Sequence, residues 1–173
     1  MFDIIARCRI CANPNLAPIL HLGEQFLTGI FPRSREQKLT CGPLELVKCH
    51  ASDGGEACGL VQLRQSYKME EMYGSNYGYR SSLNQSMVRH LRAKVENLRR
   101  LVALERGDTV LDIGSNDGTT LGCYPAEAGF ALVGIGPTAE HYKEYYRPDI
   151  LRLTDFFSAA AFRRSCPGRQ ARI

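Results

Sequence analysis

The stretch from Val110 to Thr120, VLDIGSNDGTT, decides the fold. It begins with an apolar run that ends at Ile113, continues through a turn bounded by Gly114 and Gly118, and opens a helical segment at Thr119. A buried strand that leads through such a turn into a helix directs backbone N–H groups toward the crevice at its carboxyl end. The stretch therefore predicts the first strand and helix of a parallel, doubly wound sheet.

Two more strand-and-helix units follow this stretch. After the strand at 109–113, apolar runs at 131–135 and 150–153 predict two further strands, and helical patterns occupy about 119–128, 138–146 and 158–165. This alternation predicts an α/β fold in which residues 107–173 form the first half of a Rossmann-like sheet. The residues 171–173 read as the beginning of a fourth strand.

A connector and an amphipathic helix are predicted at 67–106. Residues 67–81 are dense in tyrosine and glycine and indicate an irregular connector. Apolar residues then recur every three or four positions, which predicts a helix over about 83–105. Ser82 with Gln85 forms a capping-box pattern at its start, and Gly107 is a stop signal.

The first 66 residues are predicted to be a zinc-binding module. They are rich in Cys, Pro and Gly, and such a segment has too little apolar surface to fold without a metal or a bridge. Cys8 and Cys11 form a CxxC pair, and tetrahedral zinc needs two more ligands, for which Cys49 and Cys58 are the best candidates. Two competitors, Cys41 and His50, stay open as ligands, as does a pair of buried or redox-active thiols instead of a metal site.

Composition narrows the class of protein. The 173 residues carry a formal charge of +4, and the basic stretches lack the interleaved aromatic residues of a nucleic-acid surface. No run of about 18 apolar residues and no signal peptide is visible, so we expect a cytoplasmic protein. Seven cysteines, an odd number, favour metal ligands and buried thiols over a disulfide framework.

The loop after the first strand indicates the kind of ligand. Its Gly114-x-x-x-Gly118 spacing differs from the dinucleotide pattern, and no lysine follows Gly118 as a P-loop needs, so a diphosphate is disfavoured. Asp112, at the end of the strand, would repel phosphate but could pair with the cationic amino group of an amino-acid moiety. S-adenosylmethionine presents such a group.

Segments along nearly the whole chain resemble the sugar-nucleotide C-methyltransferase family, class I enzymes that methylate a ring carbon of a nucleotide-linked keto-deoxysugar. The resemblance rests on their order and spacing: CRIC, LHLGEQFLTGIF, GPLELVKC, CGLVQL, MYGSNYGYRSSLNQSM, LDIGSNDGTTL, GIGPTAEHYKEYY and DFFS.

The resemblance implies roles for individual residues. Structural zinc would be held by Cys8, Cys11, Cys49 and Cys58. The S-adenosylmethionine pocket would be lined by Asp112, Gly114, Ser115, Asn116, Asp117 and Gly118, with Asp155 and Phe156 approaching the adenine and the region of Tyr77, Tyr79 and Ser81 lying over the amino-acid end or the substrate. The chemistry implied is formation of an enolate next to the sugar ketone, which then attacks the methyl group of the cofactor. Neither His90 nor His141 is an attractive general base, so no catalytic residue is assigned.

Two departures from the family pattern stand out. Family members carry an acidic residue after the second strand, which grips the ribose hydroxyls, where this chain has Gly136; Glu140 is a doubtful replacement. The resemblance also implies a longer enzyme, with the base and most nucleotide-sugar contacts in a part that this chain lacks. Two alternatives remain: a methyltransferase for another substrate such as RNA, and a non-enzymatic zinc module for protein interactions with a decayed nucleotide half.

Overall fold

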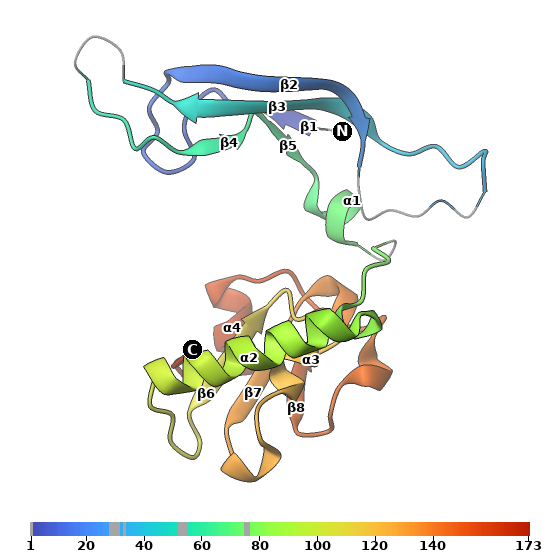
Figure 1. The fold of residues 1–173 in the computed structure, drawn as a ribbon, viewed down its shortest axis with the longest axis vertical. Helices are drawn as coiled ribbons and strands as arrows, with labels where there is room; N and C mark the ends of the chain where they lie inside the picture. Colours follow the sequence, from blue (N-terminus) through green and yellow to red (C-terminus); the bar gives the residue numbers. More distant parts are fainter. Residues whose placement is uncertain (1, 28–31, 33, 52–54, 75–76) are drawn as a thin grey trace. The chain divides into compact units, whose positions relative to one another are not determined.

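The computed structural model describes residues 2–173 except 28–31, 33, 52–54 and 75–76. The chain forms two compact units, residues 1–78 and 79–173 (Figure 1). The helix that we placed with the connector in 67–106 belongs to the second unit, because its apolar face packs on the sheet of that unit. Within the described residues, no helix has the length and apolar character needed to cross a membrane.

The first unit is built from short antiparallel strands. Strands β2 (Leu16–Phe26), β3 (Cys41–Cys49) and β4 (Val61–Leu63) form a sheet in the order β2-β3-β4, and β1 (Phe2–Ile4) pairs with β5 (Gln65–Tyr67). A short helix, α1 (Met69–Tyr73), follows. Two runs of extended character in the sequence, residues 44–47 and 60–63, correspond to β3 and β4. We did not predict β2, whose pairing with β3 is interrupted by register shifts.

The interior of the first unit is small. Among its described residues, the buried apolar side chains are Cys8, Leu27, Val47 and Cys49. Two of these four are candidate metal ligands. A unit with so few buried apolar groups needs another source of folding free energy, as the sequence indicated.

The second unit contains a three-stranded parallel sheet. Strands β6 (Thr109–Ile113), β7 (Ala131–Ile135) and β8 (Ile150–Leu153) lie in the order β6-β7-β8, at the positions predicted from the apolar runs. The mixed α/β architecture, a cysteine-containing module followed by part of a Rossmann-like sheet, is confirmed.

The final residues add the beginning of a fourth strand beside β6. Ala171 forms a parallel bridge with Thr109, and the Leu111 N–H donates to the Ile173 carbonyl oxygen at 2.8 Å. The prediction for 171–173 is therefore confirmed. The resulting spatial order places the first strand between the second and the fourth, which is the Rossmann order, and its ligand crevice lies at the carboxyl ends of the strands.

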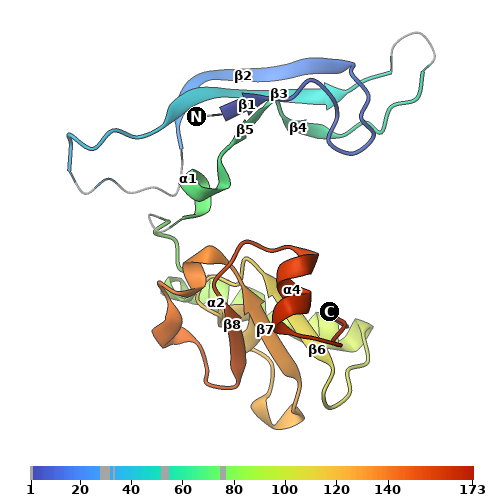
Figure 2. The same ribbon diagram turned by 180° about the vertical axis from the view of Figure 1, so that it is seen from behind.

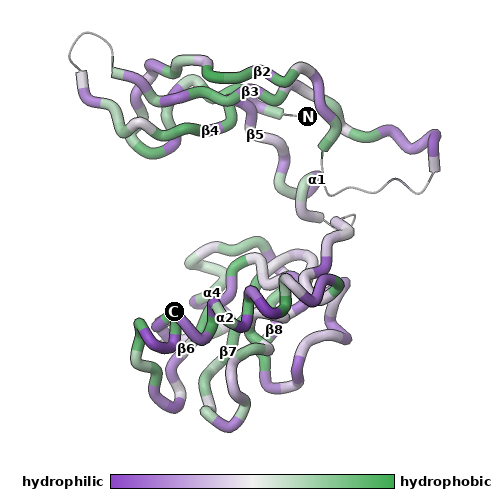
Figure 3. Tube along the Cα trace, viewed as in Figure 1, coloured by the Kyte–Doolittle hydropathy of each residue, from purple (hydrophilic) through white to green (hydrophobic). Residues whose placement is uncertain are grey.

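Helices cover both faces of this sheet. Helix α2 (Gln85–Leu101) lies on one face, where Val95 packs with Val110, Leu132 and other apolar side chains (Figure 1). Helix α4 (Ala159–Ser165) lies on the opposite face, where Phe162 packs on Val133 (Figure 2). The amphipathic pattern is visible along α2 as alternating hydrophilic and hydrophobic residues (Figure 3). Helices on both faces are typical of a doubly wound sheet.

Several helix boundaries differ from our expectations. Helix α2 begins after Asn84, whose side chain caps it by accepting the Ser86 N–H, because residues 81–83 form a separate turn, η1 (Ser81–Leu83). The expected helix at 119–128 is short: α3 (Thr119–Gly122) ends before Pro125 and is followed by η2 (Ala126–Ala128). Proline lacks the N–H that a helix interior needs. The region 138–146 contains only the turns η3 (Pro137–Ala139) and η4 (Lys143–Tyr145).

Candidate functional site

Four thiols of the first unit meet at one point. The Sγ atoms of Cys8, Cys11, Cys49 and Cys58 all lie within 4.8 Å of one another. Cys8 is 3.5 Å from Cys58, and Cys11 is 3.5 Å from Cys49. Four sulfurs bound tetrahedrally at the usual zinc distance would lie about 3.8 Å apart. The arrangement therefore fits a closed zinc centre.

The chain brings these ligands together from three segments. Cys8 and Cys11 lie on a tight turn, in which the Ala12 N–H donates to the Cys8 carbonyl oxygen and Ala12 adopts a positive φ of 59°. Cys49 ends β3, and Cys58 precedes β4. Neither competitor joins them: in the part of the chain that the structure describes, the four thiols are the one group suited to a metal, and Cys41 and His50 lie outside it.

Local hydrogen bonds favour thiolate at the turn. Backbone N–H groups of Cys11 and Ile10 lower the pKa of Cys8 to about 6. The Leu60 N–H lowers the pKa of Cys58, but burial and the three neighbouring sulfurs outweigh it and raise that pKa to about 12. Four thiolates cannot share this space without a cation, since each added negative charge opposes the next. A divalent metal ion would supply the missing charge.

A buried amide supports the cluster. Gln62 is 8% exposed, and its Oε1 accepts hydrogen bonds from the backbone and the guanidinium of Arg9. This orients Nε2, which is buried and has no hydrogen-bond partner among the described residues. The Gln62 side chain also contributes to the lowered pKa of Cys8. Asn13 lies on the other side, with Nδ2 3.6 Å from the Cys49 sulfur. Such donors fit the outer shell of a thiolate metal site.

The second constellation is the loop after β6. Gly114 and Gly118 have φ angles of 76° and 72°, and Asn116 has 49°, so the loop turns through the left-handed region three times. Gly134 of β7 leaves room for it, because a Cβ there would lie 2.7 Å from the Ser115 hydroxyl. The loop can therefore lie directly against the second strand.

Two loop side chains bind the segment that precedes α2. Asn116 donates through Nδ2 to the Tyr79 carbonyl oxygen at 2.8 Å and accepts the Ser81 N–H through Oδ1 at 3.3 Å. Asp117, which is 1% exposed, accepts the Ser82 N–H at 2.9 Å. We call residues 79–82 with these two side chains the clamp. Because the clamp occupies both side chains, the loop presents its backbone to a ligand.

The Asp117 carboxylate also accepts two hydrogen bonds from Thr119, one from its N–H and one from its hydroxyl at 2.6 Å. Burial alone would raise the pKa of Asp117, but the hydrogen bonds from Thr119 and Ser82 outweigh it and the pKa is lowered. The carboxylate is thus ionised and fixes both the clamp and the start of α3.

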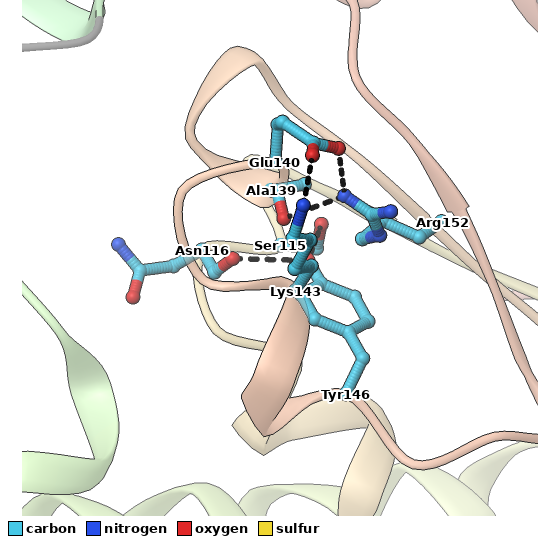
Figure 4. Close-up of polar contacts among 7 residues, drawn as sticks. All are labelled: Ser115, Asn116, Ala139, Glu140, Lys143, Tyr146 and Arg152. Carbon is cyan, nitrogen blue, oxygen red and sulfur yellow. Dashed lines mark hydrogen bonds and ion pairs between the residues drawn. The ribbon is translucent and has the colours of Figure 1, made fainter.

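Tyr146 is a loop contact that the sequence analysis missed. Its hydroxyl lies 2.7 Å from the Ser115 Oγ and donates to the Asn116 carbonyl oxygen at 3.0 Å (Figure 4). Burial and the charges of Asp112 and Asp117 raise the pKa of Tyr146 to about 12, so the phenol remains a donor. Its ring also explains Gly118, where a Cβ would approach it to 3.0 Å. No spacing rule linked this tyrosine to the loop.

Asp112 lies near the carboxyl end of β6, and no residue that the structure describes forms an ion pair with it. Burial raises its pKa, and a hydrogen bond from Thr120 and the charge of Lys94 only partly oppose this effect. A cationic ligand group beside the carboxylate would restore its ordinary acidity.

The position expected to grip a ribose is occupied by Gly136, which is buried and extended, with φ of 171°. Glu140 is already bound: it accepts from Lys143 at 2.9 Å and Arg152 at 2.5 Å, and these two contacts lower its pKa to about 2 (Figure 4). Its carboxylate is therefore engaged with two cations rather than directed freely at a ligand.

The remaining predicted residues lie around the same end of the sheet. Asp155 lines an open cleft of about 350 Å³ with Ile135, Arg152 and Thr154, and lies 3.7 Å from Arg164. Phe156 is partly exposed next to it. Tyr79 contributes its carbonyl oxygen to the clamp, and its side chain is 43% exposed. His90 and His141 are both exposed, which gives neither the enclosed setting of a general base.

Comparison with known proteins supports zinc binding by the first unit. Residues 8–73 match a family described as "Putative zinc binding domain". The matched region contains all four clustered cysteines. The family and the geometry therefore agree on zinc binding for the first unit.

The chain is also 28% identical over 135 residues to C-methyltransferase NovU of Streptomyces niveus. The match covers 77% of this chain and 30% of that protein, so the chain spans less than a third of the length of this relative. Both findings support a C-methyltransferase-like family with an N-terminal zinc module.

Proposed function

We propose that the chain forms the zinc-binding and S-adenosylmethionine-binding part of a C-methyltransferase that acts on a nucleotide-linked keto-deoxysugar. The observation that supports it most is the partly buried, weakly partnered Asp112 directly before the Gly114–Gly118 loop at the carboxyl end of β6. A relative that matches 77% of this chain is a C-methyltransferase, which favours the same methyl donor.

The residues of the loop would have distinct tasks. Asp112 would accept the amino group of the cofactor, and the backbone from Gly114 to Gly118 would follow its amino-acid portion. Tyr146 and the clamp would hold that backbone in place. S-adenosylmethionine, when bound, supplies an electrophilic methyl group. The zinc centre has all four positions filled by thiolates and would therefore be structural.

One titration tests the proposal. Calorimetry of the purified chain with S-adenosylmethionine and, separately, with NAD⁺ is combined with measurement of bound zinc. We expect one zinc per chain and binding of the methyl donor but not of NAD⁺. Zinc without binding of the methyl donor would instead support the non-enzymatic zinc module, and binding of NAD⁺ alone would overturn the assignment of the loop.

A further inference from the structure

We propose that Arg80 binds the carboxylate of the amino-acid moiety of S-adenosylmethionine; this inference rests on the proposed function. Arg80 precedes η1 and lies inside the clamp, between Tyr79 and Ser81. Tyr79 and Ser81 are both hydrogen bonded to Asn116, which holds the backbone of Arg80 beside the Gly114–Gly118 loop.

The guanidinium of Arg80 is held but not neutralised. It stacks on the Tyr145 ring, with Cζ 4.0 Å from the ring centroid. Its Nε is buried and has no hydrogen-bond partner among the described residues. A buried donor without an acceptor costs free energy until a ligand satisfies it. Stacking fixes the plane of the guanidinium, which is the arrangement suited to bidentate binding of a carboxylate.

Three other basic side chains near the loop already bind carboxylates. Lys143 and Arg152 both bind Glu140, and Arg147 binds Asp149 at 2.6 Å. No described carboxylate lies within ion-pair distance of Arg80. Unlike these three cations, Arg80 can accept a new anionic partner without breaking an existing pair.

The charges on the two sides of the loop match an amino acid. Asp112 precedes Gly114 by two residues, and Arg80 is attached through Asn116, two residues after Gly114. A free amino-acid group presents an ammonium and a carboxylate on neighbouring atoms, so its receptor needs one acidic and one basic side chain close together. The loop has both.

The test compares two ligands that differ by the amino-acid group. Calorimetry is performed with S-adenosylhomocysteine, which has the group, and with 5′-methylthioadenosine, which lacks it, on the wild type, Arg80→Gln and the control Arg89→Gln. Arg89 lies on the exposed face of α2, so the control removes the same charge from the same unit. Thermal unfolding establishes that each variant is folded.

We expect Arg80→Gln to weaken binding of S-adenosylhomocysteine about tenfold or more and to leave 5′-methylthioadenosine within about twofold. The control should change neither. Equal losses for both ligands, or no loss, would overturn the role of Arg80 while leaving the cofactor proposal intact. Failure of the wild type to bind either adenosine ligand would overturn the proposed cofactor site itself.

Discussion

Restoring an acidic residue at position 136 should strengthen binding of the proposed cofactor. Gly136 has an extended backbone, which any residue can adopt. A Cβ there would lie 3.5 Å from the Gly114 Cα and 3.6 Å from the Ser115 N, which are ordinary contacts. The Cβ of an aspartate therefore fits without moving the chain, and it would lie against the loop that we propose to hold the cofactor.

A pair of charge-assisted hydrogen bonds to ribose hydroxyls contributes about 1.5–3 kcal/mol, or roughly tenfold to 150-fold in affinity. The site is buried, so ionisation of the new carboxyl is opposed. We therefore expect the lower part of this range, about tenfold to thirtyfold tighter binding of S-adenosylhomocysteine by Gly136→Asp.

Calorimetry measures this change, with Gly136→Asn as the matched neutral control. The gain should be small in the control, and it should disappear for an S-adenosylhomocysteine analogue without the ribose 2′- and 3′-hydroxyls. If Gly136→Asp binds no more tightly than Gly136→Asn, or gains equally with the analogue, the ribose argument is wrong.

Three further changes test the metal centre and the clamp. Cys58→Ser should lose bound zinc and expose residues 1–78 to protease, while residues 79–173 stay protected. The control Cys41→Ser, which lies outside the cluster, should keep both its zinc and its protease resistance. Retention of zinc by Cys58→Ser would contradict the ligand set. Gln62→Leu should raise the zinc dissociation constant roughly tenfold in competition with a chelator, whereas an unchanged constant would remove the amide from the outer shell. Asp117→Asn should lower the free energy of unfolding of the second unit by about 2 kcal/mol at neutral pH, measured by denaturant titration. The pKa of Asp117 is lowered in the folded state. Its contribution to stability is therefore complete above the unfolded-state pKa of about 3.9 and is lost as the pH falls through the lower folded-state pKa. A stability difference between wild type and variant that does not shrink below about pH 4 would contradict this.

The sequence predicted the sheet of the second unit because its strands are short apolar runs bounded by glycine-containing turns. The strands at 109–113, 131–135 and 150–153 all lie where the pattern placed them. The four clustered cysteines were also predictable, since zinc coordination demands a second pair of thiols and two suitable ones were available.

The clamp could not be predicted from spacing. From the loop sequence alone, Asn116 and Asp117 were predicted to face the ligand. Their side chains instead form hydrogen bonds with backbone groups of a segment more than 30 residues earlier. Tyr146 was missed for a similar reason: it approaches the loop from 30 residues later. The capping prediction at Ser82 was wrong because Asp117 takes up the Ser82 N–H and the helix begins later, at an asparagine cap. Long-range hydrogen bonds decide each of these cases, and local patterns contain no signal for them.

The two units differ in what stabilises them. The second has a conventional interior, in which α2 and α4 cover opposite faces of the sheet. In the described part of the first, the buried apolar side chains other than cysteine are Leu27 and Val47, each of which contributes about 1.5–3 kcal/mol. Binding of structural zinc by small domains is coupled to folding with about 10–16 kcal/mol. The free energy of zinc binding exceeds the contribution of these two side chains together. The metal would therefore stabilise the first unit more than its buried apolar side chains do. Loss of zinc would then remove the fold of residues 1–78 and leave the sheet with its ligand loop intact.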